Sequence, residues 1–196
     1  MKQINEILEE IKEDKNDNTS TTSFKFKTDL WNFFNTDEFK TVSAVEFGTN
    51  KGQTTRVMSY LFNKVYTINF ELWRHDFAKE LNKDRNNIDY LVFDLYSRNQ
   101  LHIADDDIEV IFIDAGHDYH HVVSDIGRAI QFKNLKYLVF DDYGLITPVK
   151  DAVDEVLSMN TDTMSIAARI GHEPGHAFIG NRILKDSEGL IVRVNL

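Results

Sequence analysis

The chain has 196 residues, of which 42% are hydrophobic and 28% are charged, a composition typical of one globular domain. Its net charge of -10 argues against non-specific binding to nucleic acid or to anionic membranes, since both attract basic surfaces. It contains no cysteine, which excludes disulfides, thiolate metal sites and cysteine nucleophiles. No apolar run approaches the roughly 20 residues of a membrane helix, and the acidic residues 1–15 do not resemble a signal or transit peptide. We therefore expect a cytoplasmic protein.

The first 35 residues are predicted to form an N-terminal helical segment with a linker, ahead of a main domain at residues 36–196. Ile4, Ile7, Leu8 and Ile11 have helical spacing. The polar residues 14–23 predict a linker or mobile loop, and residues 28–34 predict a second short helix. Residues 24–27 alternate aromatic and basic side chains, and we interpret them as a short edge strand or loop rather than a nucleic-acid patch.

From residue 41 onward, predicted strands and helices alternate. The strands are short and largely apolar, as in parallel strands buried on both faces; they are residues 41–47, 64–70, 89–93, 109–113 and 136–140. Apolar residues at helical spacing lie between and after them, at 57–62, 73–81, 122–130 and 149–157. The last helix is expected to begin with Thr147 as its cap and Pro148 at its first position. This alternation indicates a doubly wound α/β fold with a parallel sheet.

The end of the chain changes character. Residues 165–170, 177–184 and 190–195 are predicted to be strands, with a turn at 185–189. An α/β core that closes with such a hairpin differs from a plain dinucleotide-binding fold, which would continue with helices.

Acidic side chains follow most of the predicted parallel strands, at the edge where open α/β sheets bind ligands. The residues at these strand ends are Glu46 and Gly48, Asn69 and Glu71, Asp94 and Leu95, Asp114 and His117, and Asp141 and Asp142. So much negative charge on one edge is costly unless a ligand or a metal compensates it. The sequence therefore predicts a functional site there.

The first strand end carries the pattern Glu46-x-Gly48-x-x-x-Gly52. A turn with glycines brings backbone amides and a helix N-terminus close to a ligand. A carboxylate at Glu46 disfavours a phosphate and favours a cationic or hydroxyl-bearing ligand. The pattern resembles the first motif of class I S-adenosylmethionine (SAM)-dependent methyltransferases.

Two later segments strengthen the resemblance. Residues 111–119, Ile-Phe-Ile-Asp-Ala-Gly-His-Asp-Tyr, resemble the Phe-Ile-Asp-Gly-x-His-x-Tyr signature of the methyltransferase-24-like family, and residues 139–143 with 148–155 resemble its next signature. The likeness covers roughly residues 40–160. It implies a Rossmann-like, mostly parallel sheet of seven strands with an antiparallel C-terminal hairpin, and SAM as the cofactor.

The resemblance also implies roles for single residues. Gly48 and Gly52 would line the methionine end of SAM, and Glu46 would face its ammonium group. The ribose acid of the family falls at Asn69, a departure that leaves open whether Asn69 or Glu71 holds the ribose. Asn50 replaces a glycine of many relatives, and asparagine tolerates a left-handed backbone. Asp94 and Leu95 would lie at the adenine edge, and the whole set predicted to contact SAM is Glu46, Gly48, Thr49, Asn50, Gly52, Thr54, Asn69, Glu71, Asp94, Leu95 and Asp114.

Asp114, Asp141 and Asp142 resemble the metal triad of Mg²⁺-dependent O-methyltransferases. Oxygen ligands from neighbouring loops suit Mg²⁺, and such an ion would hold a substrate hydroxyl and lower its pKa. His117 would be the general base, which makes His117 and Asp114 the predicted catalytic residues. The open alternative is that Asp114 and Asp141 orient the substrate or cap the following helices.

Residues 172–176, His-Glu-Pro-Gly-His, match the zinc-protease string His-Glu-x-x-His. That chemistry needs both histidines one turn apart on a helix, and Pro174 and Gly175 oppose a helix. We therefore do not expect a protease.

The favoured hypothesis is a transferase that methylates a small molecule, at oxygen, with SAM and with or without a metal ion. A SAM- or nucleotide-binding accessory protein without turnover is the alternative. An NAD-dependent oxidoreductase is less favoured, because its Gly-x-Gly-x-x-Gly fingerprint conflicts with Asn50. The expected partner is a small-molecule acceptor rather than a membrane or nucleic acid, and a homodimer through the first helix remains open.

Overall fold

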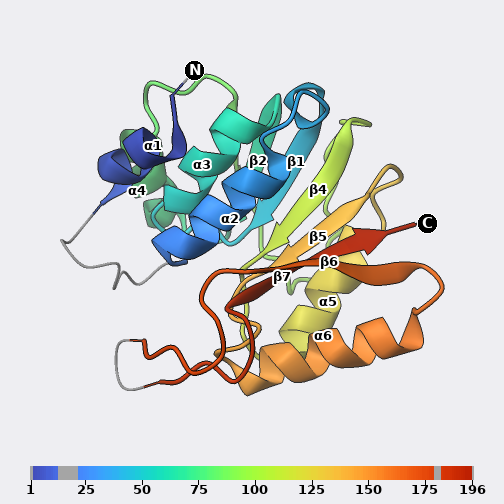
Figure 1. Cartoon of the computed structure of the whole chain (residues 1–196). Helices are drawn as coiled ribbons and strands as arrows, with labels where there is room; N and C mark the ends of the chain where they lie inside the picture. The colour runs from blue at the N-terminus through green and yellow to red at the C-terminus, as the bar shows by residue number, and fades with distance from the viewer. Residues whose placement is uncertain (1, 13–21, 179–181, 196) are drawn as a thin grey trace.

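The computed structural model describes residues 2–12, 22–178 and 182–195, which form one mixed sheet with helices on both faces (Figure 1). The N-terminal elements are α1 (Ile4–Ile11), α2 (Phe24–Phe34) and a 3-10 turn η1 (Phe39–Thr41). The alternating region comprises β1 (Ser43–Phe47), α3 (Gln53–Leu61), β2 (Lys64–Asn69), α4 (Leu72–Leu81), β3 (Ile88–Val92), β4 (Ile108–Ile113), α5 (Tyr119–Ala129), β5 (Tyr137–Phe140) and α6 (Thr147–Met159). The chain closes with β6 (Met164–Ile170) and β7 (Gly189–Val194).

The sheet has seven strands in the order β3-β2-β1-β4-β5-β7-β6. Strands β1 to β5 are parallel, and β7 runs antiparallel to both of its neighbours, β5 and β6. This confirms the doubly wound, mostly parallel sheet with an antiparallel C-terminal hairpin. The chain moves outward from β1 to β3 and then returns to β4 on the other side of β1, so the carboxyl ends of β1 and β4 flank the switch point where such sheets bind ligands.

Alternate residues of the central strands contribute to two cores. Ala44 and Phe112 belong to the core beneath α1, α2 and α3, whereas Val45 and Ile111 belong to the core beneath α5 and α6. Because both faces are covered, every residue of β1 is buried. This explains why the parallel strands were readable as short apolar runs.

The interpretation of residues 24–27 as an edge strand or loop is wrong, because they form the first turn of α2, which begins four residues earlier than predicted. Ser23 caps this helix, with its Oγ accepting the backbone N–H of Phe26 at 2.9 Å. Phe26 and Lys27 are fully buried, and the Phe26 ring meets Phe112 edge-on at 5.8 Å. Tertiary packing, rather than the period-2 pattern, decides the conformation of this segment.

Other boundaries also differ from expectation. The predicted strand at 177–184 is reduced to one isolated bridge between Ala177 and Ile183, and its residues 179–181 lie outside the described residues. Helix α6 has Ile146 at its N-cap, so Thr147 is its first residue rather than its cap. Most of the predicted linker at 14–23 is likewise outside the described residues, but Thr22 and Ser23 are buried.

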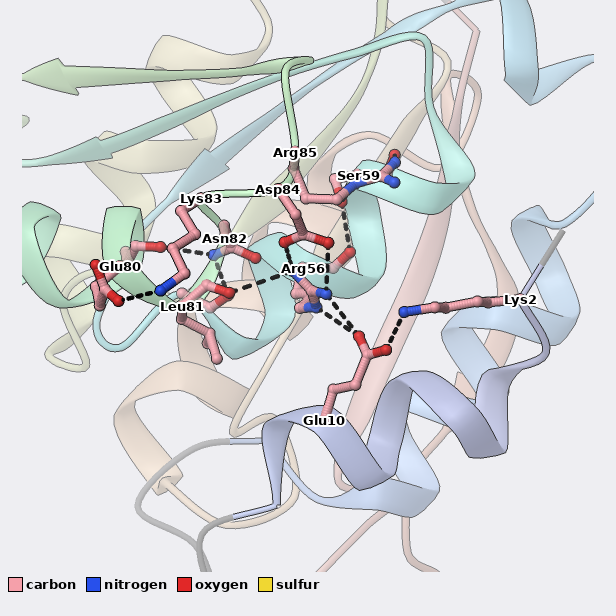
Figure 2. A network of polar contacts seen from close by, with 12 residues as sticks. Lys2, Glu10, Arg56, Ser59, Glu80, Leu81, Asn82, Lys83, Asp84 and Arg85 are labelled. Carbon is pink, nitrogen blue, oxygen red and sulfur yellow. Dashed lines mark hydrogen bonds and ion pairs between the residues drawn. The ribbon is translucent and has the colours of Figure 1, made fainter.

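An arginine joins α1 to the rest of the molecule (Figure 2). Arg56 of α3 is only 5% exposed and donates hydrogen bonds to Glu10 of α1 at 2.6 Å and to Asp84, after α4, at 2.6 Å. The bond from Arg56 lowers the pKa of Asp84 to about 2. Ile7 of α1 and Phe26 of α2 lie in the same core as Ala44 of β1. The N-terminal segment therefore shares its core with the sheet.

Among the described residues, no helix has both the length and the apolar character needed to cross a lipid bilayer.

Candidate active site

A cavity of about 730 Å³ opens at the carboxyl ends of the parallel strands. Residues that follow the strands line it, among them Gly48, Asn69, Asp114 and Asp141. Its other wall comes from both ends of the chain: from Thr22, just before α2, and from Phe178, Arg182 and Glu188 of the connection between β6 and β7. The volume falls within the range of about 300–1,000 Å³ that is usual for small-molecule and cofactor sites. The predicted functional edge is therefore hollowed as a binding site would be.

The predicted SAM-contacting residues divide into two groups. Those that line the cavity are Gly48, Asn50, Asn69, Glu71, Leu95 and Asp114. The others are described but lie outside the lining: Glu46, Thr49, Gly52, Thr54 and Asp94. The first group is placed to touch a ligand directly, and the second supports the wall or stands beside it.

Glu46 belongs to the supporting group. Its carboxylate is buried, and one oxygen accepts hydrogen bonds from the hydroxyls of Thr55 and Thr67, each at 2.5 Å. Burial raises the pKa of Glu46 to about 8. The positive charge of the fully buried Lys27 opposes that rise. Contact between Glu46 and the ammonium group of SAM stays a prediction.

The two glycines of the first motif have reasons within the fold. Gly48 has φ +103°, and a Cβ there would lie 2.0 Å from the carbonyl oxygen of Asp114. Gly52 has φ +76°, and its Cβ would meet Ala78 of α4 at 2.6 Å. We expected these glycines to allow the close approach of a ligand, whereas the structure shows the close approach of neighbouring segments at both. Asn50 has φ +43°, the left-handed conformation expected of it.

An ion pair lies at the end of β2. The Oδ1 atom of Asn69 accepts the backbone N–H of Glu71 at 2.9 Å, so this amide oxygen holds the turn. The Glu71 carboxylate accepts hydrogen bonds from Arg74 Nε at 2.5 Å and from Trp73 Nε1 at 3.1 Å. The hydrogen bond from Arg74 keeps the pKa of Glu71 below its ordinary value. Arg74, which the sequence argument missed, also donates to Asn50 at 2.7 Å and so connects the first two strand ends.

The structure groups a histidine with two of the three predicted metal ligands. His117 Nε2 lies 3.0 Å from Asp142 Oδ2 and 3.4 Å from Asp114 Oδ1. One donor atom from each of the three side chains falls within a group no more than 4.8 Å across. Hydrogen bonds to Asp114 and Asp142 raise the pKa of His117 to about 10. His117 is therefore an imidazolium at neutral pH when only the protein surrounds it.

Asp141, the remaining member of the predicted triad, lies outside this group. It lines the cavity and is 8% exposed, and its Oδ1 has no hydrogen-bond partner within the described part of the chain. Burial raises its pKa well above the ordinary value. Carboxylate and imidazole donors together suit a divalent cation, so the residues present fit a metal site formed by Asp114, Asp142 and His117, with Asp141 beside it.

Comparison with known proteins decides the family. A family profile described as a methyltransferase domain, methyltransferase-24, matches residues 45–143, just over half of the chain. The chain belongs to this methyltransferase family. No curated protein matches the chain.

Solved structures share the fold of this methyltransferase at low identity. The N-methyltransferase NodS from Bradyrhizobium japonicum, in complex with S-adenosyl-L-homocysteine (SAH), matches with a TM-score of 0.65 and 14% identity over 98% of each chain. The tRNA (m1A58) methyltransferase TrmI from Aquifex aeolicus has a TM-score of 0.63 and 15% identity, covering 100% of this chain and 76% of its own. A protein assigned as an O-methyltransferase, from Klebsiella pneumoniae, has a TM-score of 0.59 and 15% identity over 98% of this chain and 90% of its own. These matches establish a SAM-dependent methyltransferase fold and leave the acceptor open.

The segment 172–176 of the methyltransferase is not helical. It forms a turn in which Gly175 has φ +90°, and the rings of His172 and His176 stack in parallel at 3.6 Å. The expectation that this string is no zinc-protease helix is confirmed. The ring of Phe178, which lines the cavity, meets His176 at 5.2 Å.

Proposed function

We propose that this methyltransferase transfers the methyl group of SAM to a hydroxyl oxygen of a small molecule, with the help of a divalent cation. One observation carries the proposal: Asp114, His117 and Asp142 gather at the ends of β4 and β5, and all three line the cavity that the predicted cofactor residues also line. Methyl transfer needs an acceptor held in line with the methyl group and freed of its proton. A cluster of acids with a histidine at this place can serve both needs.

The cofactor side of the proposal assigns SAM to the strand ends of β1, β2 and β3. Gly48 and Asn50 would lie beside its methionine part, and Leu95 beside its adenine. We assign the ribose to Glu71 rather than Asn69, because Glu71 lines the cavity as an ionised carboxylate oriented by Arg74. A carboxylate has lone pairs to spare after accepting from Arg74 and Trp73. The side-chain oxygen Oδ1 of Asn69, by contrast, already accepts a hydrogen bond from the backbone N–H of Glu71.

The metal side of the proposal assigns the cation to the carboxylates of Asp114 and Asp142, with Asp141 beside them, and leaves His117 uncoordinated. When bound there, Mg²⁺ would lower the pKa of a coordinated acceptor hydroxyl. Asp114 and Asp142 orient His117 between them. In the transfer, the acceptor oxygen would bond to the methyl carbon as the carbon–sulfur bond breaks and SAH leaves. His117 would accept the hydroxyl proton as general base once a cation holds the Asp114 and Asp142 carboxylates, which otherwise keep its imidazole protonated.

A small acceptor is favoured over RNA by charge. The net charge is -10, and acidic side chains outnumber the basic Arg74 and Arg182 among the described residues that line the cavity; they are Glu71, Asp114, Asp141, Asp142 and Glu188. A phosphate backbone would be repelled from such an edge. The chain nevertheless shares its fold with a tRNA methyltransferase, so acceptor tests include RNA.

The experiment is a methyl-transfer assay with labelled SAM. The acceptors are vicinal diols, catechols, primary amines and total RNA, each with Mg²⁺ and with EDTA. We expect transfer to a hydroxyl compound that needs Mg²⁺ and is lost in Asp114→Asn. Asp89→Asn, which alters an exposed partner of Lys64 on β3, is the matched control and should retain activity. Full transfer in EDTA would exclude the metal, and transfer to amines or RNA alone would exclude O-methylation.

A SAM-binding accessory protein is the second candidate, and the asparagine at the ribose position is the observation that favours it. Binding of SAH without transfer to any acceptor class, Mg²⁺ present, would support that role over catalysis.

A further inference from the structure

Tyr96 lines the cavity at its adenine side, directly after Leu95, yet its hydroxyl is engaged elsewhere. The hydroxyl donates a hydrogen bond to Asp125 Oδ2 of α5 at 3.1 Å. The ring stacks on His121, also of α5, with the ring centres 3.7 Å apart and the planes inclined by 24°. A cavity-lining aromatic ring that follows β3 is thus anchored by the helix that follows β4.

Asp125 is a buried acidic residue on α5. It is fully buried, it lies outside the group formed by Asp114, His117 and Asp142, and its Oδ1 has no hydrogen-bond partner among the residues described. Burial raises the pKa of Asp125 to about 7, against the opposing charge of Arg128 and with the like charge of Asp118. A buried carboxyl group costs free energy unless it is well satisfied. The hydrogen bonds that favour its charged form come from the Tyr96 hydroxyl and the backbone N–H of Gly116.

The absence of a side chain at Gly116 leaves room for the hydrogen bond between Tyr96 and Asp125. A Cβ at Gly116 would lie 2.4 Å from the Tyr96 hydroxyl and 2.7 Å from the Cβ of His121. Gly116 does not have a positive φ, so contact rather than backbone conformation excludes a side chain there. The tyrosine hydroxyl therefore crosses the loop that carries Asp114 and His117 to reach Asp125.

We propose that Asp125 is a positioning residue for the cofactor: through the hydrogen bond across Gly116, it holds the Tyr96 ring as the wall against which the adenosine part of SAM binds. This rests on the proposed assignment of the cavity to SAM. Besides this bond the ring stacks on His121, and the His121 side chain is itself 42% exposed. Ordering the ring before binding removes part of the entropic cost of binding.

The test compares SAH affinity, by calorimetry, in wild type, Tyr96→Phe, Asp125→Ala and Asp125→Asn. Loss of one neutral hydrogen bond corresponds to about a 3- to 10-fold weaker affinity, and we expect this for Tyr96→Phe and Asp125→Ala. Asp125→Asn keeps a carbonyl oxygen that can accept from Tyr96, so its affinity should stay within about twofold of wild type. The same ratios are expected for 5′-methylthioadenosine, which carries the adenosine part without the amino-acid end.

Tyr66→Phe is the matched control. The Tyr66 hydroxyl also donates to an aspartate, Asp105 at 2.9 Å, but Tyr66 is not among the residues that line the cavity. Tyr66→Phe should leave the affinities for SAH and for 5′-methylthioadenosine unchanged. Wild-type affinity for both ligands in Tyr96→Phe would overturn the proposal. Failure of the wild-type protein to bind SAH at all would contradict the proposed function instead, so the two failures are distinguishable.

Discussion

Ser23 and Glu188, 165 residues apart in the chain, are joined by two hydrogen bonds. The backbone N–H of Ser23 donates to Glu188 Oε1 at 2.8 Å, and its hydroxyl donates to Oε2 at 2.6 Å. Glu188 is buried, lines the cavity and also accepts the backbone N–H of His172 at 3.0 Å. The start of α2 and the connection between β6 and β7 are therefore held together as one wall of the cavity. The N-terminal segment contributes to the candidate site and not only to the core.

Replacing Ser23 tests this junction. In Ser23→Ala the helix loses its cap at Phe26, and the buried Glu188 carboxylate loses one donor, so we expect the free energy of unfolding to fall by about 2 kcal/mol. Urea denaturation measures it. Thr28→Ala is the control, since in the described part of the chain the Thr28 hydroxyl donates to the Phe24 carbonyl of its own helix, and it should cost about 0.5 kcal/mol or less. Equal losses in the two variants would show that the junction adds nothing.

Gly48 and Gly175 provide a second comparison, because both have a positive φ but only one is crowded. Alanine at Gly48 would place Cβ 2.0 Å from the Asp114 carbonyl oxygen, whereas at Gly175 no described atom lies within 4 Å of the added Cβ. We expect Gly175→Ala to cost about 1–2 kcal/mol from backbone strain alone. Gly48→Ala should cost at least about 2 kcal/mol more because of the clash. Thermal and urea unfolding give both values, and a similar cost at the two positions would refute the close approach of the segments that follow β1 and β4.

The sequence predicted the sheet well because parallel strands buried on both faces leave short apolar runs, such as residues 109–113, between helical patterns. It failed at residues 24–27, where burial of both Phe26 and Lys27 comes from packing that a local pattern does not encode. The acids Asp114 and Asp142 could be predicted because a strand end defines their place. The contact of His117 with Asp142 could not be, nor the reach of Tyr96 to Asp125, since each depends on how two separate loops meet.

Glu46 predicts a pH dependence of stability. Its pKa is raised to about 8 in the folded protein, and an unfolded glutamate has a pKa of about 4.3. Between these values the folded state binds one more proton than the unfolded state, so this group makes stability fall as the pH rises, by at most about 1.4 kcal/mol per pH unit. In Glu46→Gln that contribution should vanish. Urea unfolding of both proteins at pH 5.5 to 8 measures the difference, and parallel pH profiles would contradict the raised pKa.

The assignment of the ribose to Glu71 predicts a selective effect on binding. Glu71→Gln removes the charge that would accept the ribose hydroxyls, and hydrogen bonds to charged groups contribute about 1.5–3 kcal/mol, so SAH should bind at least about tenfold more weakly. Glu80→Gln is a close control: Glu80, near the end of α4, forms an i,i+3 pair with Lys83, which follows the helix, but Glu80 lies outside the cavity lining. Calorimetry with SAH compares them. An unchanged SAH affinity in Glu71→Gln would contradict this assignment and favour Asn69 as the residue that contacts the ribose.

The central claim, that the cavity at the strand ends binds SAM, is tested most directly by SAH titration of a protein whose cavity is filled. Ala115 lines the cavity, whereas Ala167 is exposed on β6 outside it. We predict one SAH bound per wild-type chain, the same affinity in Ala167→Trp, and at least about tenfold weaker binding in Ala115→Trp, as a blocked pocket requires. Absence of binding to the wild-type protein, or undiminished binding to a folded Ala115→Trp variant, would contradict the claim.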